Sequence, residues 1–194
     1  MLNVRNLTCI RDERVLFENL SFSLGAGEAL RVEGSNGTGK TTLLRILAGL
    51  YEDYEGEVDW ALDEFPLYVG HKPGVKDLLT ATENLTWLSA LQEGQVAPDA
   101  VRAALAQVNL RGFEDVSCGS MSEGQRKRVN LARHYLTRAS AWILDEPFSA
   151  IDVSGIAALE ERMNDHVLAG GLLLLITHQQ LQLDCAVRSL RLGV

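Results

Sequence analysis

The residues best suited to chemistry form a glycine-rich loop in the first quarter of the chain. The loop reads Gly34-Ser35-Asn36-Gly37-Thr38-Gly39-Lys40-Thr41 and fits the phosphate-binding pattern G-x-x-x-x-G-K-[ST]. Its glycines let the backbone wrap closely around phosphate groups with the N–H donors pointing inward. Lys40 can then reach the β- and γ-phosphates of a nucleotide, and the Thr41 hydroxyl can ligate Mg²⁺. With Thr42, these residues are the expected nucleotide contacts, so the loop predicts NTP binding.

The segments on both sides of this loop are those that a phosphate-binding loop requires. Residues 28–33 read as a strand before it. After it, apolar residues recur at helical spacing, at Leu43, Leu44, Ile46, Leu47 and Leu50. The positive end of that helix's dipole adds to the attraction for phosphate. A glycine-rich turn that ends in Lys-Thr by chance would not need these flanks.

A second stretch carries two acids at the end of an apolar strand. Residues 141–144 are apolar, and Asp145 and Glu146 follow directly. An NTPase needs a carboxylate at such a strand end to hold Mg²⁺, and Asp145 has that position. Glu146 can act as a general base on the attacking water, a role that contributes roughly 10²–10⁴-fold. An acidic turn after a strand is common, but here the glycine loop supplies the matching half of a site.

In a third stretch, Met121–Arg128, polar residues stand at the start of a predicted helix. Ser122 and Gln125 fit a capping box. The helix therefore starts with a hydroxyl, a glycine (Gly124) and free N–H groups, which suits an anion. On its own, the pattern is more typical of an ordinary capped helix with a basic, solvated face.

Composition and charge narrow the function classes. The chain has 194 residues, enough for one or two domains, and a net charge of −8. This charge argues against electrostatic attachment to nucleic acid or anionic lipid. The three cysteines lie far apart and form no C-x-x-C pair, so neither a zinc site nor a disulfide framework is indicated. No run reaches the roughly 18 apolar residues of a membrane span, and no signal-peptide pattern is visible.

The elements that must position these residues are strands at both ends of the chain and helices in the middle. The expected strands cover residues 2–9, 15–24, 57–62, 65–70, 141–144, 172–176 and 187–194. Residues 73–138 are mostly helical, and a capping box at Thr80 opens one of their helices. A helix over 155–168 takes Ser154 as its expected N-cap. The pattern predicts an α/β fold, with a nucleotide-binding core formed by 1–72 and 139–194 and a helical subdomain at 73–138.

Taken together, these stretches resemble the ATP-binding subunit of ABC (ATP-binding cassette) transporters. The family signature Leu-Ser-Gly-Gly-Gln corresponds to Met-Ser-Glu-Gly-Gln at residues 121–125. The order also matches, with the phosphate loop, a helical insert, the signature, the strand ending in Asp-Glu, a D-loop at Ser149–Asp152 and a switch histidine at His178. The resemblance covers nearly the whole chain. It implies a P-loop NTPase with a RecA-like core, N-terminal antiparallel strands and a helical ABC subdomain.

The resemblance implies a site shared by two copies of the chain. ATP would lie between the phosphate loop of one copy and Ser122 and Gly124 of the other, in a head-to-tail dimer. Glu146, His178 and Lys40 would be the catalytic residues, while Thr41 and Asp145 would hold Mg²⁺. His71, His134 and His166 have no such support, and we interpret them as structural or solvated.

Two positions depart from the family pattern. The aromatic residue that usually stacks on adenine is replaced, by spacing, by Arg11. A guanidinium can also lie over a ring, and a solvated turn arginine is an equally good interpretation. The family's glutamine near the metal and the membrane-domain contact is replaced by Lys72. A lysine has donors only and cannot ligate a metal in the same way.

Within the family, the sequence is most similar to the ATP-binding subunits of cytochrome c biogenesis. The segments behind this are residues 34–37, 70–76, 144–153 and 177–179. The resemblance implies integral-membrane, haem-handling partners and peripheral attachment at the cytoplasmic face of a bacterial inner membrane. It also implies ATP hydrolysis that serves haem export or delivery, or the release of a haem-loaded chaperone. No C-x-x-C-H motif is present, so we do not expect this chain itself to bind haem. Alternatives are the ATPase of another exporter, a soluble ABC protein without a membrane partner, and a module that binds nucleotide without hydrolysing it.

Overall fold

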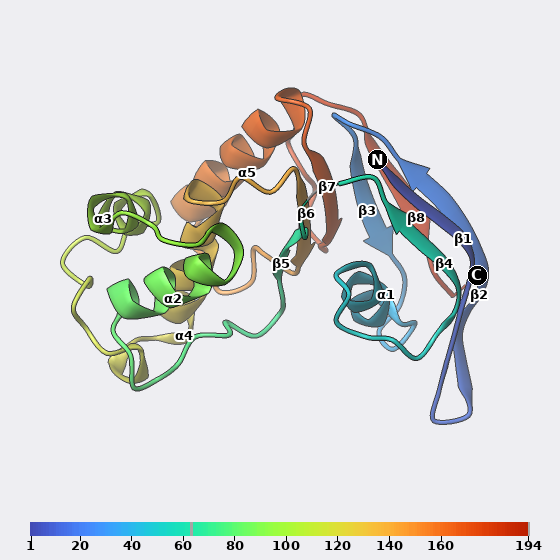
Figure 1. Cartoon of the computed structure of the whole chain (residues 1–194), viewed down its shortest axis with the longest axis horizontal. Helices are drawn as coiled ribbons and strands as arrows, with labels where there is room; N and C mark the ends of the chain where they lie inside the picture. Colours follow the sequence, from blue (N-terminus) through green and yellow to red (C-terminus); the bar gives the residue numbers. More distant parts are fainter. Residues whose placement is uncertain (63, 194) are drawn as a thin grey trace. The chain divides into compact units, whose positions relative to one another are not determined.

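The computed structural model describes residues 1–62 and 64–193, which divide into two compact units (Figure 1). The first unit comprises Met1–Tyr68, Ala139–Glu146 and Met163–Val194, and the second comprises Val69–Arg138 and Pro147–Arg162. The second unit thus includes the predicted D-loop and the start of the helix that follows it. The domain limits expected from the sequence, at 72/73 and 138/139, stay a proposal.

The first unit contains two β-sheets. The antiparallel sheet has the order β2-β1-β4, with β1 at Leu2–Arg11, β2 at Arg14–Leu24 and β4 at Glu55–Trp60. The second sheet has the order β5-β6-β7-β3-β8, with β5 at Leu67–Val69, β6 at Ala141–Asp145, β7 at Leu172–Ile176, β3 at Ala29–Glu33 and β8 at Val187–Arg191. Strands β6, β7, β3 and β8 run parallel. The expected last strand is therefore confirmed as an edge strand, ending at Arg191, while Val194 lies outside the described residues.

The core of the first unit is apolar. Its central parallel strands are buried on both faces and therefore consist mostly of apolar residues. All five residues of β7, the run Leu172–Ile176, are buried, as a doubly covered parallel strand requires. Helix α1, at Lys40–Leu47, turns its four apolar residues into the same core. Figure 1 shows α1 between the two sheets, each of which contributes side chains to this core. The strand–loop–helix unit predicted around the phosphate loop is confirmed.

The hairpin between β1 and β2 is tighter than predicted. The sequence predicted strands at 2–9 and 15–24, but Arg11 and Arg14 also pair with each other in the ladder. Only Asp12 and Glu13 form the turn, with φ of 50° and 61°. Positive φ at both central residues is what a two-residue type I′ turn requires. Strand β1 therefore ends two residues later, and β2 begins one residue earlier, than the apolar pattern indicated.

The second unit is mostly helical, as the sequence predicted for residues 73–138. Its helices are α2 at Ala81–Glu93, α3 at Pro98–Gln107, α4 at Glu123–Leu131 and the first part of α5 at Val153–Leu168, with short 3₁₀ turns at Cys118–Ser120 and Ala132–Tyr135. The capping box of α2 is confirmed, because the Thr80 hydroxyl accepts a hydrogen bond from Glu83 N–H at 3.2 Å and the Glu83 carboxylate accepts one from Thr80 N–H at 2.8 Å.

The start of α5 differs from the prediction. The helix begins at Val153 and not at Gly155, and its cap is Asp152 and not Ser154. The Asp152 carboxylate accepts hydrogen bonds from Gly155 N–H at 2.8 Å and from the Ser154 hydroxyl at 3.0 Å. Asp and Ser are about equally good caps, but the helix begins at Val153, so Asp152 is at the cap position and Ser154 is already inside the first turn. These hydrogen bonds hold the pKa of Asp152 below its usual value, and the one from Gly155 has the largest effect. The charge of the nearby Arg128 acts in the same direction.

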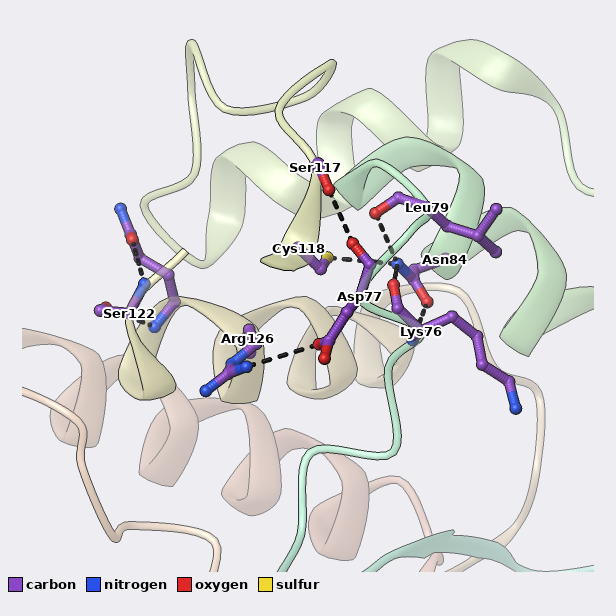
Figure 2. A network of polar contacts seen from close by, with 9 residues as sticks. Lys76, Asp77, Leu79, Asn84, Ser117, Cys118, Ser122 and Arg126 are labelled. Atoms are coloured by element: carbon purple, nitrogen blue, oxygen red, sulfur yellow. Dashed lines mark hydrogen bonds and ion pairs between the residues drawn. The ribbon is translucent and has the colours of Figure 1, made fainter. Parts of the chain in front are cut away.

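A fully buried asparagine fixes the loop before α2. The Asn84 amide donates to the carbonyls of Lys76, Leu79 and Thr80 at 2.9–3.1 Å and to the Cys118 sulfur at 3.2 Å, and its Oδ1 accepts from Lys76 N–H at 2.7 Å. In Figure 2, Asn84 lies at the centre of this network. Asn84 therefore ties residues 76–80 to the turn that precedes the signature.

Replacing Asn84 by Ala should lower the free energy of unfolding by about 2–3 kcal/mol, because buried backbone groups lose their partners. Urea unfolding followed by circular dichroism measures this difference. Thr86→Ala, on the exposed face of the same helix, should change the midpoint little. Equal midpoints for Asn84→Ala and the wild type would show that the network does not stabilise the fold.

Candidate active site

The phosphate loop joins β3 to α1 in a conformation that depends on its glycines. Gly34 and Gly39 have φ of 148° and 90°. A Cβ at Gly34 would lie 2.7 Å from the Leu192 carbonyl oxygen, and one at Gly39 would lie 2.9 Å from Leu16 Cβ. Neither position has room for a side chain. The approach of Leu192, near the other end of the chain, has no signal in the sequence.

Lys40, the first residue of α1, folds back over this loop. Its Nζ donates to the carbonyl oxygens of Gly34 at 2.8 Å and Ser35 at 3.0 Å. The Thr38 hydroxyl also donates to the Ser35 carbonyl, at 2.9 Å. The lysine ammonium therefore lies beside the phosphate loop. The N-terminus of α1, which follows this loop, has the positive end of the helix dipole and favours an anion.

Thr41 and Asp145 meet across the unit, although 104 residues separate them in the chain. The Thr41 hydroxyl donates to Asp145 Oδ2 at 2.9 Å, and Asp145 is only 2% exposed. This pairing arises because β6 ends at Asp145, close to the start of α1. Hydroxyl and carboxylate oxygens are the ligand types that Mg²⁺ prefers. Within residues 1–62 and 64–193, no cluster of three or more His, Cys, Asp and Glu is suited to a metal ion, so Mg²⁺ here would also need phosphate and water oxygens.

Glu146 and His178 form the next pair. His178 Nε2 lies 3.3 Å from Glu146 Oε1, and their side chains are 72% and 22% exposed. Glu146 has a φ of 51°, and its N–H donates to the Ile176 carbonyl at 3.0 Å. A non-glycine residue in this region of φ carries backbone strain, which is common at functional sites. With this backbone conformation, directly after the end of β6, the Glu146 carboxylate lies beside His178.

His178 also borders a cleft of about 270 Å³. Its lining includes Gly34, Lys40, Thr177 and His178, together with Arg31 and Glu33 of β3. Sequence reasoning missed Arg31 and Glu33, because their environment depends on β8. Hydrogen bonds from Ser189, Arg31 and Arg191, together with the charge of Arg31, hold the pKa of Glu33 below its usual value. Glu33 therefore lies between the cations of Arg31 and Arg191.

The signature segment belongs to the second unit. Its predicted capping box is confirmed, since the Ser122 hydroxyl accepts from Gln125 N–H at 3.2 Å and Gln125 Oε1 accepts from Ser122 N–H at 2.9 Å. A Cβ at Gly124 would lie 2.5 Å from the Ala150 carbonyl oxygen. Lys127 donates a hydrogen bond to the Ser149 hydroxyl. These contacts fix the signature helix against the predicted D-loop.

A family model described as "ABC transporter" matches residues 17–149. The "Cytochrome c biogenesis ATP-binding export protein CcmA" of Aliivibrio fischeri is 48% identical to the chain, over 100% of both proteins. The protein of the same name from Escherichia coli O157:H7 is 50% identical, over 93% of this chain and 90% of that protein. The chain belongs to the ABC transporter family, in its cytochrome c biogenesis branch. The resemblance drawn from the motifs is therefore confirmed.

A solved structure supports the fold of this ABC protein. A dimeric ATP-binding cassette bound to ADP and phosphate superimposes with a TM-score of 0.82, over 92% of this chain and 88% of that chain, at 22% identity. The predicted fold class is thereby confirmed. Among the helices of the described residues, none is long and apolar enough to cross a membrane.

The remaining predicted residues lie as follows. Arg11 ends β1, with its Nε 3.6 Å from Asp12 Oδ2 and its side chain 57% exposed. Lys72 and His71 are exposed in the loop after β5. His134 is buried with Nδ1 2.8 Å from the Leu131 carbonyl oxygen, and His166 stacks on Trp142 with ring centroids 3.9 Å apart. The last two histidines have the structural role that the sequence suggested.

Gly124 offers a test of the signature segment. Gly124→Ala should lower ATP turnover by about tenfold or more, because the new Cβ forces the signature helix away from Ala150 and displaces Ser122. Nucleotide binding to the isolated chain should stay unchanged, since the phosphate loop lies in the other unit. Phosphate release and nucleotide titration measure the two effects. Ser120→Ala, an exposed change just before the signature, is the control, and full turnover in Gly124→Ala would contradict the steric argument.

Proposed function

We propose that the chain is the ATP-hydrolysing subunit of a membrane complex for cytochrome c maturation. The hydrolytic part is supported by two contacts, that of Thr41 with Asp145 and that of Glu146 with His178. His178 shares the lining of the cleft with Lys40. The cytochrome c part is supported by relatives that are 48% and 50% identical and carry that name.

In this proposal, each residue of the first unit has one task. Lys40 leaves the loop carbonyls and binds the β- and γ-phosphates, which the N–H groups of residues 34–42 surround. Thr41 and Asp145 hold Mg²⁺, which when bound neutralises charge on the phosphate oxygens. Glu146 accepts the proton of the attacking water, and His178 hydrogen-bonds Glu146 and the γ-phosphate.

A second copy of the chain completes the site. Ser122 and Gly124 of that copy contact the γ-phosphate from the opposite side, in a head-to-tail dimer, and Asp152 couples the two sites. The N-terminus of α4, with Ser122 as its N-cap and Gly124 in its first turn, suits an anion. The dimeric state of a cassette of the same fold supports this arrangement.

The complex also contains integral-membrane, haem-handling subunits, with this chain at the cytoplasmic face of the inner membrane. ATP hydrolysis there serves haem delivery or the release of a haem-loaded chaperone.

Purification of the tagged chain from detergent-solubilised membranes of its host tests the assembly. We expect integral-membrane proteins to co-purify and the complex to release phosphate from ATP. A tagged cytoplasmic protein of similar size is the control. Recovery of the chain without any membrane protein would refute the proposed assembly.

A further inference from the structure

The β1–β2 hairpin rests on the phosphate loop. The Cβ of Leu16 and the ring of Phe17 lie 2.9 Å and 3.2 Å from the position that a Cβ would take at Gly39. Closer to the turn, Arg14 Nη1 lies 3.7 Å from the Cβ position of Gly37. The guanidinium of Arg14 is therefore adjacent to the middle of the loop that would surround the phosphates.

The hairpin also places two positively charged side chains, Arg11 and Arg14, next to each other. Arg11 and Arg14 are directly opposite in the antiparallel ladder, so their side chains leave the same face of the hairpin. Like charges at directly opposed positions are destabilising. Arg11 has Asp12 nearby, at 3.6 Å. The Arg14 side chain is exposed and has no hydrogen-bond or ion-pair partner within residues 1–62 and 64–193.

We propose that Arg14 is a further nucleotide-binding residue, whose guanidinium contacts the phosphate chain of the bound nucleotide beside Gly37. The inference rests on the proposed ATP-binding function. A bound phosphate chain supplies the anion that offsets the repulsion between Arg11 and Arg14. The guanidinium presents donors in a planar fork, which matches phosphate oxygens in two-point contacts. Arg14 thereby adds a second side-chain cation to that of Lys40.

The test compares three ligands on the full chain, namely MgATP, MgGTP and magnesium tripolyphosphate, by isothermal titration. Arg14→Gln removes the charge and keeps most of the side-chain length. It should weaken the binding of all three ligands by the same factor, roughly three- to tenfold, as expected for a partly exposed charged contact. Arg14→Lys should lose less, because it keeps the charge but not the fork. Arg5→Gln, which removes an equal charge from the same sheet at an exposed ion pair with Glu57, should bind like the wild type.

Three results would overturn the inference, and the third would also overturn the proposed ATP-binding function. Unchanged binding of all three ligands by Arg14→Gln would show that Arg14 is merely solvated. Weaker binding of ATP and GTP with unchanged tripolyphosphate binding would place Arg14 on the base or the ribose. Failure of the wild type to bind any of the three ligands would remove the proposed ATP-binding function itself, and this inference with it. Thermal unfolding of each variant confirms that the comparison is made on folded protein.

Discussion

Glu146→Gln should lower ATP turnover by about 10²–10⁴-fold, the usual contribution of a general base. The amide keeps the size of the carboxylate and its place beside His178, but it cannot accept the proton of the attacking water. ATP binding should persist, because the phosphate loop, Lys40 and the Thr41–Asp145 pair are unchanged. The variant should therefore hold ATP without releasing phosphate. Phosphate release by the purified complex measures turnover, and titration with ATP measures binding.

Glu18→Gln is the matched control for this change. Glu18 is exposed on β2, outside the cleft, and its replacement removes the same charge. Turnover at the wild-type rate in Glu146→Gln would show that Glu146 is not the base. Loss of binding together with turnover would show that Glu146 acts through the structure of the site.

Lys40→Ala should weaken ATP binding by roughly 10- to 100-fold, the range for losing one strong hydrogen bond to a charged group. Lys40 Nζ contacts the carbonyl oxygens of Gly34 and Ser35, so its removal takes away both the cation for the phosphates and a tether across the loop. Turnover should fall at least as much as binding. Isothermal titration with MgATP measures the affinity.

Lys76→Ala controls for the loss of a lysine. Its ammonium lies 5.4 Å from the centre of the Trp87 ring, in the second unit, so ATP binding should be unaffected. Wild-type affinity in Lys40→Ala would contradict the assignment of residues 34–41 as the nucleotide loop.

The sequence was most informative where a motif carries its own geometry. The phosphate loop, the caps at Thr80 and Ser122 and the buried strand at 172–176 depend on short-range patterns, and the structure has them where the patterns placed them. The meeting of Thr41 with Asp145 was also predictable, because two motifs of one fold were recognised.

The sequence was least informative where neighbouring strands decide the environment. Glu33 is held between Arg31 and Arg191 only because β8 lies beside β3 with Glu33 opposite Arg191. Arg14 reaches the phosphate loop because a two-residue turn sets the register of the hairpin. The cap of α5 was misassigned because Asp152 and Ser154 are both good capping residues, and their local geometry decides between them.

The most direct test is haem staining of c-type cytochromes in the host after deletion of this chain. The account predicts that covalently bound haem is lost, that the wild-type chain restores it, and that Glu146→Gln, present at the same level, does not. Normal haem staining without the chain, or full restoration by Glu146→Gln, would contradict the claim that ATP hydrolysis by this protein serves cytochrome c maturation.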